Sequence, residues 1–177
     1  MTDVVEREIK VKLTIDPEAF LNTLLKEGYT YEGEEIHEDI YLNGENKDFR
    51  KTDEALRLRL VNGRAELTYK GPRLGTKSKS REEVTVTLDD KNGMLKILEK
   101  LGYRAVFTIK KRRKLLKKNG FTVCIDSVED LGDFLEIEGI NVSEDELMNF
   151  FNNFREKFKI KGDIIYKSYL EMRVGKS

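Results

Sequence analysis

Charged side chains recur at every second position along several segments of this chain that read as β-strands. In residues 5–11, Glu6, Glu8 and Lys10 take alternate positions. Further segments with the same alternation lie at 55–60, 81–88 and 134–138. Alternate residues of a strand share one face and lie about 6.6 Å apart, so each segment has a charged face and a largely apolar face. The apolar faces need cover, and the charged faces must meet either water or an enclosed polar interior.

Composition narrows the classes of partner. The 177 residues include 33 basic and 33 acidic side chains, and a net charge near zero argues against a nucleic-acid or membrane coat, which needs a basic surplus. The chain has no run of 18 apolar residues, and its first residues contain no apolar signal segment. The single Cys124 cannot form an internal disulfide. These features predict a soluble cytoplasmic protein without a nucleic-acid or membrane partner.

Turn and cap signals divide the chain into strands interrupted by a few helices. Asn62-Gly63 and Asn119-Gly120 are two-residue hairpin signals, and Ser143 opens a capping box. We predict strands at 4–13, 36–42, 48–51, 55–61, 65–70, 81–88, 104–116, 121–128 and 133–140, helices at 17–27, 91–101, 144–159 and 163–173, and a mobile basic loop at 71–80. This order favours an α+β, mainly β fold, with a closed or strongly curved antiparallel sheet and helices packed outside.

The sign of the charge differs from one strand-like segment to the next. On one strand alone, such charges are most simply the solvated face of an amphipathic sheet. Several segments with this pattern favour a barrel with a polar interior, where buried charges must be paired or bound to a ligand. The acidic set is Glu6, Glu8, Asp126, Glu136 and Glu138, and the basic set is Lys10, Arg57, Arg59, Lys70, Arg81, Lys111 and Arg113. Carboxylates bind divalent metal and Arg and Lys bind phosphate oxygens, so the pattern indicates a site for a metal-bound polyphosphate.

Alternation leaves one part of this assignment open. Cations occupy both parities of residues 106–114. The two candidate pairs are Lys111 with Arg113 and Lys110 with Arg112. Outside these segments, we expect His37 at the surface or in a turn and Tyr169 as a packing residue.

An ordered set of short motifs resembles those of CYTH-domain proteins. The motifs are E-x-E-x-K at 6–10, EDIYL at 38–42, TDEALRLR at 52–59, LTYKGP at 67–72, SREE at 80–83, KKRR at 110–113 and DSVEDLGDFLEIE at 126–138. Each motif alone is weak, but their order is specific and covers most of the chain. This superfamily of triphosphate tunnel metalloenzymes comprises class IV adenylyl cyclases, thiamine triphosphatases and inorganic triphosphatases. The chain resembles its class IV adenylyl cyclase-like branch in particular.

The resemblance implies a single CYTH domain over residues 1–177, folded as an eight-stranded antiparallel barrel whose charged lumen binds triphosphate. It implies the metal ligands Glu6, Glu8, Glu83, Asp126, Glu136 and Glu138, with Glu6, Glu8 and Glu138 as the catalytic set. It implies triphosphate binding by Lys10, Arg57, Arg59, Lys70, Arg81, Lys111 and Arg113. Many relatives carry a further Glu where this chain has Thr85, which bears on the metal shell.

We therefore expect metal-dependent hydrolysis of triphosphate compounds, either inorganic triphosphate or nucleoside triphosphates, with two ions of Mg²⁺ or Mn²⁺. The first alternative is a class IV adenylyl cyclase that converts ATP to cyclic AMP and pyrophosphate. Cyclisation needs a pocket for adenine and a folded-back ribose, and no sequence feature supplies one. The second alternative is a polyphosphate- or nucleotide-binding module without turnover. The expected partner is a small-molecule triphosphate, bound by a monomer or homodimer.

Overall fold

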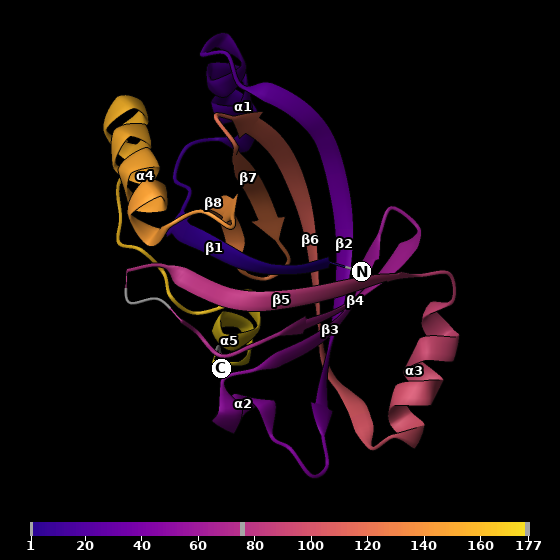
Figure 1. Ribbon diagram of the computed structural model, residues 1–177. Coiled ribbons are helices and arrows are strands. Elements are labelled where there is room, and N and C mark those ends of the chain that lie inside the picture. Colours follow the sequence, from indigo (N-terminus) through magenta and orange to yellow (C-terminus); the bar gives the residue numbers. More distant parts are fainter. Residues whose placement is uncertain (1, 75–76, 176–177) are drawn as a thin grey trace.

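The computed structural model, which describes residues 2–74 and 77–175, contains a closed antiparallel barrel with helices around it (Figure 1). The strands are β1 (Thr2–Lys12), β2 (Thr30–Gly44), β3 (Ala55–Val61), β4 (Arg64–Lys70), β5 (Lys79–Leu88), β6 (Tyr103–Lys118), β7 (Phe121–Val128) and β8 (Gly132–Ile140). They follow the order β1-β5-β4-β3-β2-β6-β7-β8, and β8 pairs again with β1. This arrangement confirms the predicted fold class.

Two Asn-Gly turns set the register of the hairpins in the barrel. Asn62 and Gly63 have positive φ angles of 48° and 84°, and Asn119 and Gly120 have φ angles of 53° and 82°. Positive φ at both central residues is the requirement of a two-residue hairpin turn, and it explains why these dipeptides join β3 to β4 and β6 to β7. The predicted hairpins are therefore present at both positions.

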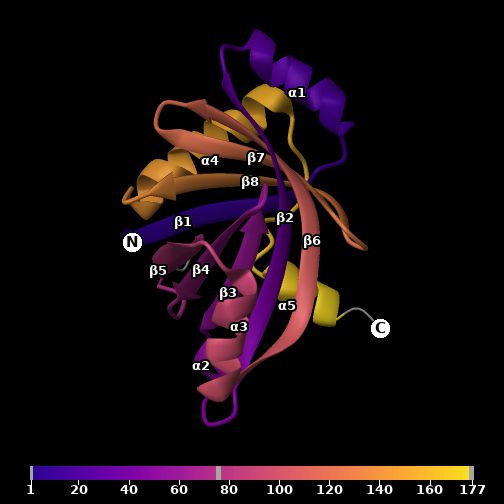
Figure 2. The same cartoon turned by 90° about the vertical axis from the view of Figure 1, so that its right-hand side faces the viewer.

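Helices cover the apolar outer faces of the strands, so the charged faces point into the barrel. The helices are α1 (Pro17–Lys26), α2 (Phe49–Thr52), α3 (Lys91–Lys100), α4 (Glu144–Phe158) and α5 (Tyr169–Val174). Under α1 and α4, Phe20, Phe151 and Phe154 pack on the apolar side chains of β1, β7 and β8. α3 packs Leu98 on Leu58 of β3, and it lies on a different side of the barrel from α4 (Figures 1 and 2).

The last helix occupies the inside of the barrel wall rather than the outside. Tyr169 of α5 packs with Ile109, Val128 and Phe134. Each of these three residues lies two positions from an interior charged residue of the same strand (Lys111, Asp126 and Glu136), and therefore on the same, interior face. α5 therefore contacts the interior surface of the barrel and forms part of the wall of any space inside it.

The predicted strand at 48–51 is wrong. Asp48 accepts a hydrogen bond from the backbone N–H of Arg50 and begins the short helix α2, which ends at Asp53 in a left-handed conformation with φ 56°. A side chain that caps a helix competes with strand pairing, and here the cap prevails.

Two element boundaries close to the cavity also differ from prediction. β5 begins at Lys79, inside the segment 71–80 that was expected to be a loop; residues 75 and 76 of that segment lie outside the described residues. The final helix begins at Tyr169 instead of 163, because Ser168 caps it and the preceding backbone bonds to β1 through Ile165 N–H and the Lys10 carbonyl.

Within the described residues, no helix has both the length and the apolar character needed to span a membrane.

Candidate functional site

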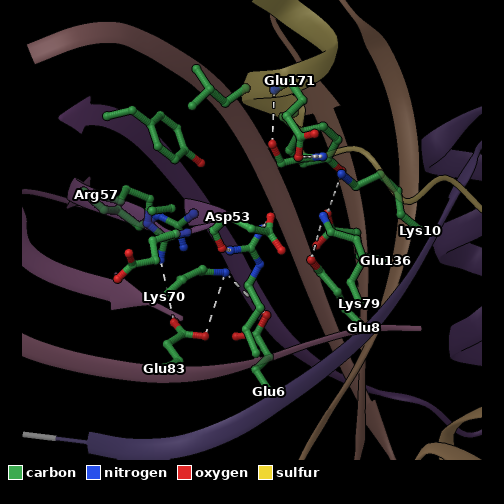
Figure 3. A pocket seen from close by; sticks show the side chains of 18 of the residues that line it. Glu6, Glu8, Lys10, Asp53, Arg57, Lys70, Lys79, Glu83, Glu136 and Glu171 are labelled. Carbon is green, nitrogen blue, oxygen red and sulfur yellow. Dashed lines mark hydrogen bonds and ion pairs between the residues drawn. The ribbon is translucent and has the colours of Figure 1, made fainter. Parts of the chain in front are cut away.

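Opposite charges line a cavity of about 250 Å³ inside the barrel (Figure 3). Of the side chains described around it, nine are Lys or Arg and eight are Asp or Glu. The cations are Lys10, Arg50, Arg57, Arg59, Lys70, Lys79, Arg81, Lys111 and Arg113, and the acids are Glu6, Glu8, Asp53, Glu54, Glu83, Glu136, Glu138 and Glu171. Strand alternation produces most of this lining, because each strand directs every second side chain inward; Arg50, Asp53, Glu54 and Glu171 come from α2, the residues after it and α5. The charged faces thus meet an enclosed interior, as the barrel interpretation requires.

Three carboxylates converge at one place in this cavity. Glu6 and Glu8 lie on β1, Glu138 lies directly opposite Glu8 on β8, and one oxygen of each falls within 4.8 Å of the others. Burial, together with neighbouring carboxylates, raises the pKa of Glu138 to about 7 and raises that of Glu6 well above its usual value, although Arg113 and Lys70 oppose these shifts. Clustered carboxylates that resist ionisation are relieved by a divalent cation, and oxygen ligands are those that Mg²⁺ and Mn²⁺ prefer. The donor set therefore fits such an ion.

A cationic wall faces this cluster on β3 and β4. The Lys70 ammonium lies 3.6 Å from a Glu6 oxygen and 3.8 Å from a Glu83 oxygen, and Arg57 lies 3.9 Å from Glu83. The Nε of Arg57 is buried and makes no hydrogen bond. An unsatisfied buried donor of a permanent cation is costly, so this part of the cavity suits an additional anion.

A second wall carries tightly bonded ion pairs. Arg59 donates two hydrogen bonds to Asp39, at 2.6 and 2.8 Å, and Lys111 donates a third at 3.2 Å. Arg113 donates to both oxygens of Asp126 at 2.7 Å. These bidentate pairs fix the guanidinium groups in one orientation, which keeps the positive charge at defined positions in the cavity.

Arg113 connects the carboxylates of β7 and β8. Besides Asp126, it donates to Glu136 at 2.9 Å and to Glu138 at 3.2 Å. Although burial alone would raise the pKa of Glu136, Arg113 and Lys10 hold it well below the usual value. Glu136 is thus an ionised carboxylate, next to Glu138 whose proton is held much more tightly.

Asp126 lies behind Arg113, outside the residues that line the cavity. Its side chain is fully buried and accepts from Arg113 and, at 2.7 Å, from the hydroxyl of Tyr169. Of the six predicted metal ligands, the structure brings together Glu6, Glu8 and Glu138, holds Glu83 and Glu136 in ion pairs with cavity cations, and places Asp126 behind the wall.

All seven predicted phosphate-binding cations line the cavity, but they differ in how freely they can meet a ligand. Arg113 makes four hydrogen bonds to carboxylates, and Arg81 donates to the carbonyls of Asp53 and Gly71, both at 3.0 Å. Lys10 donates to the Lys167 carbonyl at 2.8 Å, and burial and the nearby Lys79 ammonium lower its pKa to about 7.

The structure decides the parity of residues 110–113. Lys111 and Arg113 are buried and line the cavity, whereas Arg112 is exposed and donates to Glu34 on the outer face. Thr85, the position where many relatives carry Glu, shares a 2.9 Å hydrogen bond with Thr68 and does not line the cavity. The three-carboxylate cluster is therefore built without a contribution from residue 85.

Sequence reasoning missed several groups of this site. Asp39 continues the alternation of its strand, so the signal was present in the sequence. Lys79 was assigned to the basic loop at 71–80, where it could meet phosphate at the mouth of the tunnel, but it lies on β5 and lines the cavity. Tyr169 was expected only to pack, but its hydroxyl bonds Asp126 and its ring centroid lies 3.9 Å from the Lys10 ammonium. No periodicity marks Tyr169, because its position depends on a non-local crossing of the chain.

The expectation for His37 was wrong, because this residue is buried. It has 2% exposure, bonds Glu35 through Nε2 and has no hydrogen-bond partner at Nδ1. Burial, reinforced by Arg59, Lys111 and Arg113, lowers its pKa far below the usual value, against the opposing effect of Asp39. The folded protein therefore holds His37 in its neutral form.

This burial predicts a specific pH dependence of stability. Below a pH of about 6.5 the unfolded chain binds a proton at His37 that the folded chain does not, so folding stability falls by up to about 1.4 kcal/mol per pH unit. Urea unfolding of the protein and of His37→Gln between pH 7 and 5 should show a shallower decline for the variant. Equal slopes for the two proteins would contradict neutral burial of this histidine.

The amino-acid sequence matches a known protein family. Residues 5–167 match the family model of the CYTH domain. The chain belongs to the CYTH domain family. Over 174 residues this CYTH chain is 42% identical to the Methanocaldococcus jannaschii protein named "Putative adenylate cyclase MJ0240", with 96% of this chain and 99% of that protein covered. The name agrees with the adenylyl cyclase-like branch that the motifs indicated.

Solved structures share the fold along nearly the whole CYTH chain. The PH1819 protein of Pyrococcus horikoshii has a TM-score of 0.82 and 34% identity, covering 97% of this chain and 99% of that one. The adenylyl cyclase-named HpAC1 of Hippeastrum, described as revealing a dominant triphosphatase activity, has a TM-score of 0.77 and 16% identity, covering 98% and 97%. At 16% identity, the comparison with HpAC1 shows a shared fold and nothing further.

Proposed function

We propose that this protein is a metal-dependent hydrolase of triphosphate compounds. The observation that carries the proposal is the cavity itself, in which a cluster of three carboxylates faces a wall of buried cations. A triphosphate brings several negative charges, and it needs both a metal ion and cationic side chains to enter a low-dielectric interior. The small volume, about 250 Å³, suits a compact polyanion.

The residues divide into two roles under this proposal. Glu6, Glu8 and Glu138 would hold Mg²⁺ or Mn²⁺, with Glu83 and Glu136 beside them. Such an ion, when bound, neutralises phosphate charge and lowers the pKa of a coordinated water. Arg57, Arg59, Lys70, Lys111 and Arg113, with Lys10 and Arg81, bind and orient the phosphates and stabilise charge on the transferred group, which is the principal protein contribution to phosphoryl transfer. Asp126 acts through Arg113, whose orientation it fixes.

The names of the relatives favour adenylyl cyclase as the second candidate. That reaction needs the ATP ribose folded so that its 3′-hydroxyl reaches the α-phosphorus. Tyr41 and Phe49 line the cavity and offer aromatic surface, but polar groups arranged to select adenine are lacking among the described lining residues. Charge complementarity alone is sufficient for hydrolysis, which is why we prefer it. Because one fold supports several reactions, relatives' names do not fix the chemistry.

One assay separates these candidates. The purified protein is incubated with inorganic triphosphate or ATP, with Mg²⁺, Mn²⁺ or a chelator, and orthophosphate, pyrophosphate and cyclic AMP are followed together. Orthophosphate release that needs metal and yields no cyclic AMP supports the hydrolase. Cyclic AMP with equimolar pyrophosphate supports the cyclase, and tight triphosphate binding without any product supports a binding module.

Metal should also stabilise the protein, independently of turnover. A ligand that binds only the folded state raises the unfolding free energy, by about 2.7 kcal/mol at a hundredfold excess over its Kd. We expect Mn²⁺ to raise the melting temperature and a chelator to reverse the rise. An unchanged melting temperature of the parent protein after addition of excess Mn²⁺ would argue against a metal site in this cavity.

A further inference from the structure

Lys79, at the start of β5, places a buried ammonium directly against the carboxylate cluster. Its partner in the strand register is Glu8 of β1, and its Nζ lies 3.1 Å from a Glu8 oxygen. Both side chains are largely removed from solvent, with 7% and 11% exposure. The pair lies on the same side of the cavity as Lys10 and Glu136 (Figure 3). This ion pair is therefore part of the site and not a surface contact.

Glu8 lies between two neighbours of opposite charge. On one side β5 presents Lys79, and on the other β8 presents Glu138. A metal ion bound by Glu6, Glu8 and Glu138 needs the same carboxylate that Lys79 holds. The two cations would share one carboxylate in a poorly solvated space, where they repel each other, so the ion must displace the ammonium or lose affinity.

A displaced Lys79 ammonium would lack a second carboxylate. Among the ion pairs of the described residues, Glu8 is its one partner, whereas Lys70 is shared between Glu6 and Glu83. The neighbouring ammonium of Lys10 adds further positive charge to the same region. An unpaired buried ammonium is costly, and the remedy that fits this cavity is a phosphate oxygen of the substrate.

We propose that Lys79 couples metal binding to triphosphate binding. In the metal-free protein its ammonium neutralises Glu8; when metal occupies the carboxylate cluster, the ammonium turns to the phosphate that enters with it. Coupling of this kind is reciprocal, so the anion must tighten metal binding by the same factor as metal tightens anion binding. The inference rests on the proposed function, because it assumes that metal and triphosphate share this cavity.

The test measures Mn²⁺ affinity directly, through the electron spin resonance signal of the free ion. Titrations are run without anion and with imidotriphosphate, a triphosphate whose bridging nitrogens resist hydrolysis, and a protein-free titration corrects for Mn²⁺ held by the anion in solution. Lys79→Met should bind Mn²⁺ about tenfold more tightly than the parent without anion. The additional tightening that imidotriphosphate produces in the parent should be about tenfold smaller in the variant.

Three further variants make the result specific. Lys79→Arg retains the positive charge and should restore the weaker Mn²⁺ affinity and the coupling of the parent. Lys77→Met removes an exposed ammonium of the same segment, paired with Asp145, and should match the parent in both titrations. Lys79→Gln also removes the charge but retains a polar tip. It should give the result expected of Lys79→Met, and it replaces that variant in the test if the methionine variant is poorly folded.

The outcomes separate this inference from the proposed function. If neutral variants of Lys79 leave both Mn²⁺ affinities unchanged while Glu8→Gln weakens Mn²⁺ binding, the metal site stands and the coupling role of Lys79 is overturned. If Glu8→Gln also leaves Mn²⁺ binding unchanged, metal does not use this cluster, and both the coupling and the proposed hydrolase fail. Tighter Mn²⁺ binding with reduced anion coupling in the neutral variants supports Lys79 as a positioning residue.

Discussion

Replacing Glu138 with Gln should reduce turnover of triphosphate by about a hundredfold or more, which corresponds to about 3 kcal/mol of transition-state stabilisation. Glu138 lies opposite Glu8 and shares the carboxylate cluster with Glu6. Glutamine has nearly the same shape, but its amide is a neutral and much weaker metal ligand. The loss should therefore come from metal binding, and added Mn²⁺ should recover part of the rate at concentrations well above those that saturate the parent.

The same variant should remain folded. Removing one negative charge from three crowded carboxylates relieves repulsion in the metal-free protein, so its melting temperature in chelator should equal or exceed that of the parent. Glu82→Gln is the matched control, since Glu82 is the exposed neighbour of Glu83 on β5, and its turnover should be unchanged. Full activity of Glu138→Gln would remove this residue from the metal site and weaken the case for hydrolysis at the cluster.

Replacing Arg113 with Met should have the largest effect on stability. The guanidinium bonds Asp126 twice and reaches both Glu136 and Glu138, and it has only 7% exposure. Its removal leaves buried carboxylates without their common counter-ion, which costs about 3–5 kcal/mol when one partner of a buried pair is lost. Urea unfolding in chelator measures this loss.

The neighbouring residue supplies a control for that measurement. Arg112 precedes Arg113 on β6 but points outward, with 58% side-chain exposure and a single bond to Glu34. Arg112→Met should change the unfolding free energy by less than about 1 kcal/mol. Similar losses for both variants would mean that the interior network contributes no more than a surface ion pair. Mn²⁺ should restore part of the stability of Arg113→Met, because the ion supplies the missing positive charge.

Strand alternation made the barrel and most of the cavity predictable from the sequence. The inward positions of β1, β3 and β8 carry charge at strict intervals of two, so Glu8, Arg57 and Glu136 could be assigned before any contact was known. The same period includes Asp39, inside the EDIYL motif, and Lys79, which lies in the segment predicted as a loop before β5.

Other features could not be predicted from strand alternation. The helix α2 exists because the Asp48 side chain caps it, and a four-residue helix has no periodicity. The position of Tyr169 follows from residues 160–168 crossing to β1, where Ile165 bonds the Lys10 backbone. The displacement of Asp126 behind Arg113 follows from Tyr169 and Arg113 occupying both of its oxygens. The contact of Ile165 with Lys10 joins residues more than a hundred positions apart, and the contact of Tyr169 with Asp126 joins residues 43 positions apart.

The position of β1 between β5 and β8 has a consequence for how the protein is made. Glu6 and Glu8 leave the ribosome first, but their neighbour Glu138 is synthesised some 130 residues later. Contacts of such long sequence separation form slowly, because loop-closure entropy must be overcome before they contribute. Until β8 pairs with β1, the barrel is an open sheet with two unpaired edges, and the carboxylates of the site are apart. A nascent chain that stops before β8 can therefore neither close the barrel nor assemble the cluster.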